Sequence, residues 1–172
     1  MPYKRTIVTE GHAALRRAAK RVTPQELAEP LFQQLIDDMF LTMYEAPGVG
    51  LAAPQVGISK QLFVADVKDE EHQPVAVINP KIVAAEDEIE LTEGCLSVPG
   101  YVGEITRFSR VAVSGLDRHG HKIRLEGDGL FAQCVQHEID HLHGKLYKDS
   151  ARNVRLSTPA DEREDPESAQ EA

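Results

Sequence analysis

The chain has 172 residues, of which 41% are hydrophobic and 27% are charged, a composition ordinary for one globular domain. The net charge of -9 argues against a nucleic-acid-binding protein. No apolar run approaches the roughly 20 residues that span a bilayer, and the segment MPYKRTIVTE lacks the apolar stretch of a signal peptide. We therefore expect a cytoplasmic protein with no membrane partner, whose two cysteines, Cys95 and Cys134, are free or metal-bound.

An amphipathic helix is predicted over residues 23–46, before a loop rich in Gly and Pro. Thr23 suits the N-cap, Pro24 suits the first turn, and Glu26 completes a capping box. Pro30 is a caution, because it could delay the true start of the helix. Apolar residues at helical spacing form one stripe, made of Leu27, Leu31, Leu35, Met39 and Phe40.

Short strands are predicted next, because residues 61–67, 75–80 and 82–91 are rich in β-branched residues or alternate in polarity. Two further runs, 110–116 and 121–127, flank the turn sequence DRHG and predict a hairpin. The fold class that follows is α+β, with small antiparallel sheets around one central helix in a single domain.

That central helix is predicted over residues 127–144, with Asp128 as N-cap and Gly144 just past its end. The remaining chain is polar, and from Ser157 on it carries six acidic residues and one Arg. We expect residues 1–150 to form the folded domain and residues 151–172 to form an acidic, disordered tail.

The central helix contains QHEIDHLHG, which has the spacing H-E-x-x-H. Because helix positions i and i+4 share a face, His137 and His141 would point their rings at one place. Glu138 lies about 100° around the helix and could reach a water on a bound metal as a general base. The alternative is a pair of surface histidines with a solvated glutamate. Apolar residues on more than one side of the helix favour burial, and buried histidines need a partner such as a metal.

A third ligand must come from elsewhere. The longer zinc-protease pattern would need His at position 147, which is Tyr, and the acids downstream lie mostly in the predicted tail. Upstream, EGCLSVPG presents Cys95, whose thiolate would bind zinc or iron well. Cys134 competes for this role, and an inert buried cysteine is a further alternative. We prefer Cys95, because Gly94 lets its backbone turn so that the sulfur can point inward.

Three segments together resemble the motifs of the peptide deformylase family, in the family's order. They are GVGLAAPQ (48–55), EGCLS (93–97) and QHEIDHLHG (136–144). The similarity runs from about Ile7 to about Tyr147 and ends before the acidic tail. The resemblance implies an enzyme that removes the formyl group from N-formylmethionine at the N-terminus of newly made polypeptides and releases formate.

The resemblance also implies the metal site. The ligands would be Cys95, His137 and His141, and Glu138 would move the protons. Three protein ligands and one open position are the arrangement of a catalytic metal rather than a structural one. The family's usual metal in cells is iron(II), with zinc, nickel or cobalt as alternatives in purified protein.

The remaining site residues implied by the resemblance surround the substrate. The formyl oxygen would be stabilised by the side chain of Gln55 and the backbone N–H of Leu96, and Gly50 would lie beside the formyl group. The backbones of Val49 and Gly94 would pair with the peptide as a strand would. The methionine pocket would be lined by Val49, Leu130, Cys134 and the ring face of His137, and plain core packing is the alternative for Leu130 and Cys134.

The implied partners are N-formylmethionyl nascent peptides, with transient proximity to the ribosome, for a protein expected to be a monomer. The acidic tail should not bind RNA directly, because phosphate would repel it. One departure is Val102, where the family often has Arg after Pro-Gly, and Tyr101 could serve instead. Glu93 and Arg107 could form a buried supporting pair, with a surface ion pair as the alternative.

Three rival functions remain. The first is a metallopeptidase of another kind, against which the missing downstream ligand argues. The second is a deformylase-like protein that binds a metal or nascent chains without catalysis, against which the intact ligand and acid–base positions argue. The third is a ribosome-associated binding module, which an acidic tail does not favour.

Overall fold

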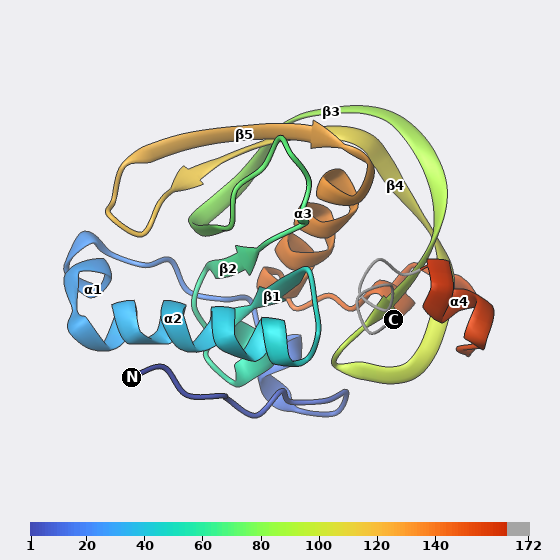
Figure 1. Cartoon of the computed structure of the whole chain (residues 1–172), viewed down its shortest axis with the longest axis horizontal. Coiled ribbons are helices and arrows are strands. Elements are labelled where there is room, and N and C mark those ends of the chain that lie inside the picture. Colours follow the sequence, from blue (N-terminus) through green and yellow to red (C-terminus); the bar gives the residue numbers. More distant parts are fainter. Residues whose placement is uncertain (165–172) are drawn as a thin grey trace.

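The computed structural model describes residues 1–164, and their backbone forms one antiparallel sheet with helices on either side (Figure 1). The strands are β1 (Gly50–Ala52), β2 (Leu62–Ala65), β3 (Val75–Cys95), β4 (Val98–Leu116), β5 (Lys122–Asp128) and β6 (Arg152–Leu156). They are hydrogen-bonded in the order β1-β2-β3-β4-β5, and β6 pairs with β4. The predicted α+β class is confirmed, and the strands join into a single sheet.

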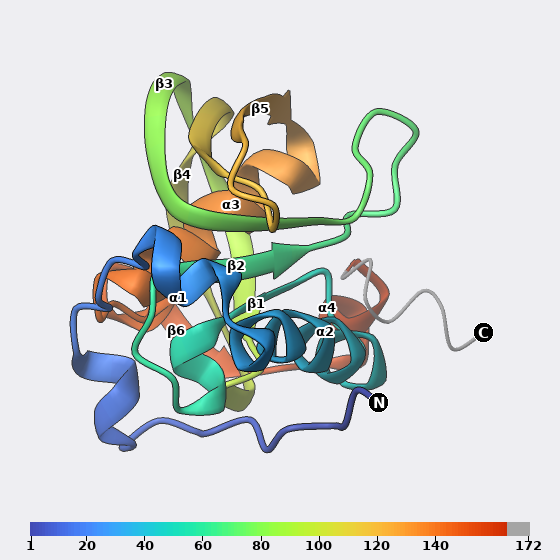
Figure 2. The same ribbon diagram turned by 90° about the vertical axis from the view of Figure 1, so that its left-hand side faces the viewer.

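The helices are α1 (Pro24–Ala28), α2 (Pro30–Glu45), α3 (Gly129–Leu142) and α4 (Pro159–Glu164), with 3-10 turns η1 (Ala13–Arg16), η2 (Ala53–Val56) and η3 (Tyr147–Asp149). In Figure 1, α3 lies beneath the arch formed by β3, β4 and β5, while α2 runs along the opposite side. Turning the molecule shows the loop between β2 and β3 projecting away from this body (Figure 2). Among the described residues, no helix combines the length and apolarity that crossing a bilayer requires.

The hairpin of β3 and β4 brings Cys95, at the end of β3, close to α3. Its register shifts between Ile78 and Lys81 and again between Ile82 and Ala84, and irregularities of this kind bend a strand. The two strands therefore curve around α3, and the end of β3 at Glu93–Cys95 returns to the middle of the molecule (Figure 1). The predicted DRHG hairpin is present as well, with β5 following a turn at residues 117–120.

The predicted helix over residues 23–46 is in fact two helices. Thr23 caps α1 with the predicted capping box, and α1 then stops at Ala28, because Pro30 cannot continue its hydrogen bonding and instead begins α2. The predicted stripe is wrong at Leu31, whose side chain is 80% exposed. The interruption rotates the buried face of α2, which is formed by Phe32, Leu35, Ile36, Asp38, Met39, Thr42 and Met43.

The helix α3 is largely buried, as its apolar composition predicts. It begins after Asp128, whose side chain makes no cap hydrogen bond, and it ends before Gly144. Gly144 has a φ of +73°, and a Cβ there would lie 2.8 Å from the carbonyl oxygen of Arg16. Only glycine meets both requirements, so the chain turns tightly at this point and α3 packs against the N-terminal segment.

The expectation of a disordered tail over residues 151–172 is wrong for its first part. Residues Arg152–Leu156 form β6, and Pro159–Glu164 form α4. The composition predicted disorder because it offers few apolar residues, but β6 is held by backbone pairing to β4, which needs none. Residues 165–172, the rest of the predicted tail, lie outside the described residues.

Candidate metal centre

The helix α3 places two imidazole rings at one point. His137 and His141 are one helical turn apart, and their Nε2 atoms lie 3.1 Å from each other. His141 is 1% exposed, and the side chain of His137 is 11% exposed. Two buried ring nitrogens that face each other at this distance can share either a proton or a cation.

Cys95 completes the cluster from the end of β3. Its Sγ atom lies 3.4 Å from Nε2 of His141, and one possible ligand atom from each of Cys95, His137 and His141 lies within 4.8 Å of the others. Cys134, the competing cysteine, is one turn before His137 but directs its sulfur to the carbonyl oxygen of Val49, at 3.6 Å. The geometry therefore groups Cys95, rather than Cys134, with the two histidines.

This donor set fits a divalent transition metal. Metal–sulfur distances of about 2.3 Å and metal–nitrogen distances of about 2.0–2.1 Å place tetrahedral ligand atoms roughly 3.5 Å apart. The two separations from Nε2 of His141, 3.1 Å to His137 and 3.4 Å to Cys95, approach that value, and all three atoms lie within 4.8 Å of one another. Tyr147, at the position where the longer zinc-protease motif needs His, supplies no ligand and instead stacks its ring on His137 at 6.5 Å between centroids.

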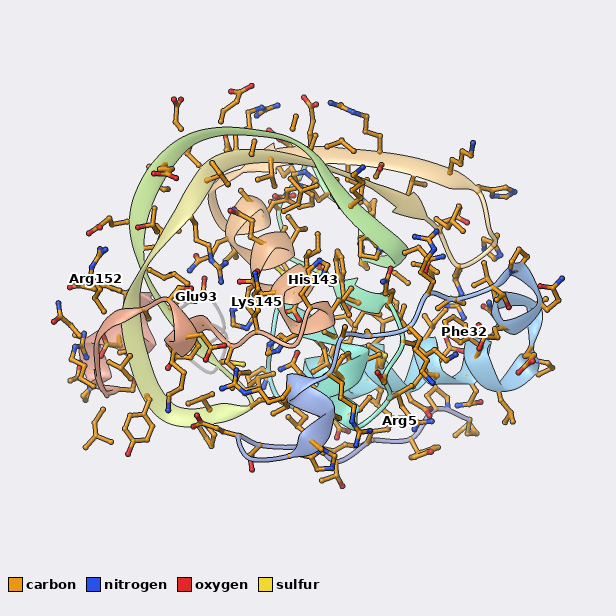
Figure 3. All side chains as sticks on the ribbon, turned by 180° about the vertical axis from the view of Figure 1, so that it is seen from behind. Arg5, Phe32, Glu93, His143, Lys145 and Arg152 are labelled. Atoms are coloured by element: carbon orange, nitrogen blue, oxygen red, sulfur yellow. The ribbon has the colours of Figure 1, made fainter. Side chains whose placement is uncertain are left out.

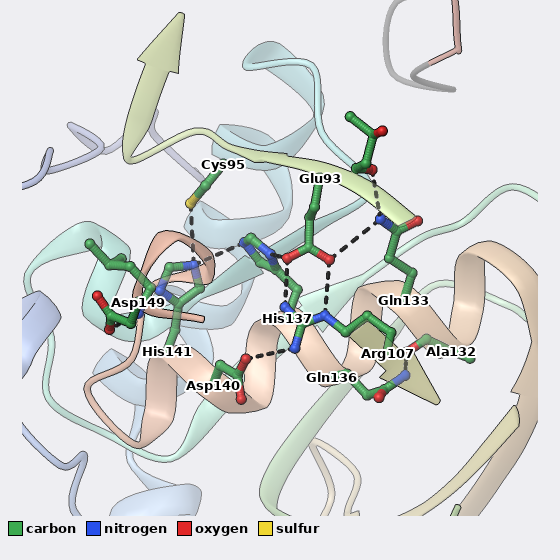
Figure 4. A network of polar contacts seen from close by, with 12 residues as sticks. Glu93, Cys95, Arg107, Ala132, Gln133, Gln136, His137, Asp140, His141 and Asp149 are labelled. Atoms are coloured by element: carbon green, nitrogen blue, oxygen red, sulfur yellow. Dashed lines mark hydrogen bonds and ion pairs between the residues drawn. The ribbon is translucent and has the colours of Figure 1, made fainter. Parts of the chain in front are cut away.

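A buried ion network orients His137 (Figure 4). Oε2 of Glu93 lies 2.7 Å from Nδ1 of His137, so Nε2 of the same ring is left to face the cluster. Arg107 donates to both oxygens of Glu93, at 3.0 and 2.5 Å, and to Asp140 at 2.7 Å. The side chains of Arg107 and Glu93 are 7% and 5% exposed, so this is the buried supporting pair and not a surface one.

Charge shifts the pKa values of the two histidines in opposite directions. Burial lowers the pKa of His137, but the negative charges of Glu93 and Cys95 raise it by more, to well above 6.5. Burial and the neighbouring charge of His137 hold the pKa of His141 well below 6.5. Burial raises the pKa of Glu93, but His137 and Arg107 lower it by more, so the net pKa is about 2. The protein groups thus favour one positive charge where the ring nitrogens meet, as a bound cation would supply.

Glu138 lies beside the cluster and is 4% exposed. The backbone of Gly50 in β1 approaches it so closely that a Cβ at Gly50 would lie 2.6 Å from Oε1 of Glu138 and 2.7 Å from Sγ of Cys134. A side chain at position 50 would therefore displace the glutamate. This close approach explains why the loop that leads into β1 needs glycine there.

The side chain of Gln55 is fixed on the other side of the cluster. Its Oε1 atom accepts from the backbone N–H of Ala52 at 2.9 Å, which directs the Nε2 donor towards Ser97 Oγ at 3.3 Å and Cys95 Sγ at 3.7 Å. Gln55 is 2% exposed, so its donor is aimed and held before any ligand binds. Leu96 lies between the two residues that this donor contacts.

The N-terminal segment ties these loops together, which the sequence did not indicate. The backbone N–H of Val8 donates to the carbonyl oxygen of Gln55, and that of Glu10 donates to the carbonyl oxygen of Ser97, both at 2.8 Å. Extended pairing of this kind leaves no motif in the side chains. The network partners Asp140 and Gln133, which bond to Arg107 and Glu93, were likewise not predicted.

A cavity of about 600 Å³ opens beside Cys95, His137 and Glu138. Every other residue that the sequence placed around a substrate lines it, namely Val49, Gly50, Gln55, Gly94, Leu96, Leu130 and Cys134. Val102 and Tyr101 also line it, together with several residues that the sequence did not place there, among them Ser157 and Asp161. His141 lies behind the cavity wall, as a buried ligand would.

Comparisons with known proteins agree with this geometry. A model of the polypeptide deformylase family matches residues 4–156. The peptide deformylase of Symbiobacterium thermophilum is 48% identical over 165 residues, which cover 95% of this chain and 75% of that protein. A crystal structure of a peptide deformylase from Legionella pneumophila matches with a TM-score of 0.80 and 42% identity, over 92% of this chain and 88% of that one. A peptide deformylase from Acinetobacter baumannii, solved with Met-Ala-Ser bound, matches with a TM-score of 0.82 and 34% identity, over 87% and 99% of the two chains.

Proposed function

The chain belongs to the polypeptide deformylase family, and from this premise we propose that Cys95, His137 and His141 hold its catalytic metal ion. The protein is a metal-dependent hydrolase that removes the formyl group from N-formylmethionine at the N-terminus of newly made polypeptides. One observation carries the assignment of the site: the cluster of one thiol and two imidazoles opens onto a cavity in which Glu138 is buried beside it.

We propose iron(II) as the metal in cells, with zinc, nickel or cobalt as ions that purified protein could hold. The thiolate and the two imidazoles suit all four, so the choice follows availability as much as affinity. When bound, such an ion polarises an oxygen ligand and lowers the pKa of water near it. Glu93 and Arg107 hold His137 in the orientation that this ligation needs.

Glu138 is the group that we assign to proton transfer. Water adds to the formyl carbon, Glu138 accepts a proton from that water, and the proton passes to the leaving nitrogen as the carbon–nitrogen bond breaks. The products are formate and a peptide with a free N-terminus. A positioned acid–base group of this kind typically contributes about 10²–10⁴-fold to the rate.

The formyl oxygen gains negative charge in this step, and we assign its stabilisation to Gln55 and the backbone N–H of Leu96. The Nε2 donor of Gln55 is already fixed by the contact of its Oε1 atom with Ala52. A donor that is aimed before reaction costs no reorganisation, and one such donor is typically worth about 3 kcal/mol. Gly50 leaves room for the formyl group beside Glu138.

The rest of the cavity would bind the peptide. The backbones of Val49 and Gly94 would pair with it as a strand, and the methionine side chain would enter between Leu130, Cys134 and the ring of His137. The relative from A. baumannii binds Met-Ala-Ser, which has the chemistry of a deformylated product, and this supports a peptide N-terminus as the occupant here.

We further propose that the protein acts in the cytoplasm as a monomer, with one catalytic domain that includes residues 1–150 and the strand β6. Its substrates would reach it as nascent chains, which implies transient proximity to the ribosome. The net charge of -9 gives it no electrostatic attraction to RNA, so we expect contact through the nascent peptide and not through direct nucleic-acid binding.

The test is formate release from formyl-Met-Ala-Ser by protein loaded anaerobically with iron(II). We expect turnover by the wild type and loss of at least about 100-fold in Glu138→Ala with its metal content retained. Cys95→Ser should lose metal, measured by elemental analysis. Cys134→Ser is the matched control, because it removes a sulfur from the same cavity without touching the cluster, and its metal content should stay at the wild-type level.

Two outcomes would contradict this proposal. A folded, metal-loaded wild type that releases no formate would indicate a binding protein without catalysis. Equal metal loss in Cys134→Ser and Cys95→Ser would show that the ligand assignment is wrong, although the activity itself could stand.

A further inference from the structure

The cavity has a wall that lies outside the three family-like motifs. Ser157 and Asp161 line the same cavity as Cys95 and Glu138, although they follow β6 and belong to the part of the chain that composition predicts to be disordered. A volume of about 600 Å³ falls within the ~300–1,000 Å³ of pockets that enclose drug-sized ligands, which are larger than one formylmethionine residue. A peptide that fills this cavity therefore extends past its first residue.

The strand β6 brings this wall to the cavity. It pairs with β4 so that Arg155 lies opposite Val102, and the backbone N–H of Ser157 donates to the carbonyl oxygen of Gly100 at 2.8 Å. Val102 and its neighbour Tyr101, which lies opposite Leu156, both line the cavity, so the end of β6 lies beside it. Figure 3 shows Arg152, at the start of β6, on the outer side of the curved hairpin and Glu93 on its inner side.

The turn after β6 is fastened by Asp161. Its carboxylate accepts from both terminal nitrogens of Arg155, at 2.6 and 2.8 Å, from the backbone N–H of Thr158 at 2.7 Å and from the Thr158 hydroxyl at 2.8 Å. The Asp161 side chain is only 9% exposed. A bidentate ion pair with two further hydrogen bonds has specific geometry, so it fixes where residues 157–161 sit against the cavity.

We propose that residues 157–161, held in place by the Arg155–Asp161 ion pair, form the outer wall of the substrate groove and contact the peptide residues that follow formylmethionine. This inference rests on the proposed function of the same site. Arg155 and Asp161 are positioning residues here, because they act through the placement of the wall and not on the formyl group. The wall contributes to binding of the peptide and leaves the chemistry at the cluster unchanged.

The experiment compares a long and a short substrate, formyl-Met-Ala-Ser and formyl-methioninamide, in iron(II)-loaded full-length protein. Two variants break the same ion pair from either side, Arg155→Ala and Asp161→Ala. We expect KM for formyl-Met-Ala-Ser to rise by about tenfold in both, with kcat within about twofold, as for a lost contact that binds ground state and transition state alike. KM for formyl-methioninamide should stay within about twofold, because this substrate ends before the wall.

The matched control is Arg110→Ala. Arg110 is an arginine of similar exposure to Arg155, 40% against 50%, and it makes an ion pair with Glu126 away from the cavity. It should change neither KM. If the ratio of the two KM values is the same in all variants and the wild type, the wall makes no contact with substrate and the proposal is wrong.

A second measurement does not depend on turnover. Amide hydrogen exchange of residues 157–161 should slow when the metal-loaded wild type binds the product peptide Met-Ala-Ser, and should not slow with methioninamide. Absence of protection by Met-Ala-Ser would overturn the proposal. A wild type that releases no formate from either substrate would instead overturn the proposed function. The proposal that residues 157–161 contact the substrate would then be wrong as well.

Discussion

The helices α2 and α3 make the same kind of contact with the sheet but use their buried polar residues differently. On α2, the carboxylate of Asp38 is fully buried, and it accepts from the backbone N–H of Tyr3 at 3.0 Å, from Arg5 at 2.9 Å and from Gln34 at 2.7 Å. These partners lie in the N-terminal segment and on α2 itself, and none of them lines the cavity beside Cys95. On α3, Gln136 bonds to the backbone of Phe108, but the buried side chains of Glu138 and His141 converge with His137 on a cluster beside a cavity.

Buried polar side chains therefore serve two different purposes in this molecule. A buried charge that is fully satisfied by its surroundings, as on α2, fastens one part of the chain to another. On α3, His137 is fixed at one ring nitrogen by Glu93 while its other nitrogen faces His141 and Cys95. Buried donors and ligands that are oriented by one set of partners and aimed at a second place indicate a binding site.

The largest effect should come from removing the support of α3 with Arg107→Met. This leaves the Glu93 carboxylate buried without its bidentate partner, so we expect a loss of about 3–5 kcal/mol in the free energy of unfolding, measured by urea denaturation. Metal affinity should fall about 10–100-fold as His137 loses its orientation. Arg118→Met is the control on the α2 side, where a 32% exposed arginine pairs with Asp37 and should cost about 1 kcal/mol or less. If both variants lose the same free energy of unfolding, the ion network of α3 is no more important for stability than the exposed ion pair beside α2.

A smaller effect, confined to stability, is expected for Asp38→Asn. Burial raises the pKa of Asp38, but the bonds from Tyr3, Gln34 and Arg5 lower it by more, so the net pKa is below its usual value. The stabilisation is therefore complete above about pH 4 and is lost as the pH falls further. We expect Asp38→Asn to lose about 1–3 kcal/mol at pH 7, with a difference from wild type that shrinks below pH 4 in thermal unfolding. Activity per folded molecule should not change, and a loss in kcat would show that α2 also serves the site.

The smallest effect is expected at Leu31, which the sequence placed on the buried stripe. Because its side chain is 80% exposed, Leu31→Ala should change the free energy of unfolding by no more than about 0.5 kcal/mol. Leu35→Ala, one turn on and 6% exposed, should cost about 2–5 kcal/mol. Denaturant titrations of the two variants would show whether the break at Pro30 sets the buried face of α2, since similar costs would contradict it.

What the sequence predicted well depends on local pattern. The turn at residues 117–120, the capping box at Thr23 and the helix that carries His137 and His141 are each encoded within a few residues. The grouping of Cys95 with these histidines is not local, and only the resemblance to a family distinguishes it in the sequence. Sequence spacing alone could not separate it from Cys134.

What the sequence could not predict is pairing between distant backbones. Val8 and Glu10 brace the loops of Gln55 and Ser97 through main-chain hydrogen bonds, for which any side chain would serve. The strand β6 was missed for the same reason, since composition reports the apolar area that a segment can bury and not the edge that it can join.

The span of the cluster along the chain has a consequence for the synthesis of this protein. Cys95 and His141 are separated by 46 positions, and the brace from Glu10 to Ser97 closes a much longer loop. Contacts of such high sequence separation form late, because the closure entropy must be met before they are made. The ligand set cannot assemble until His141 has emerged from the ribosome. The chain can therefore act on nascent peptides only after all three of its own ligands have been synthesised.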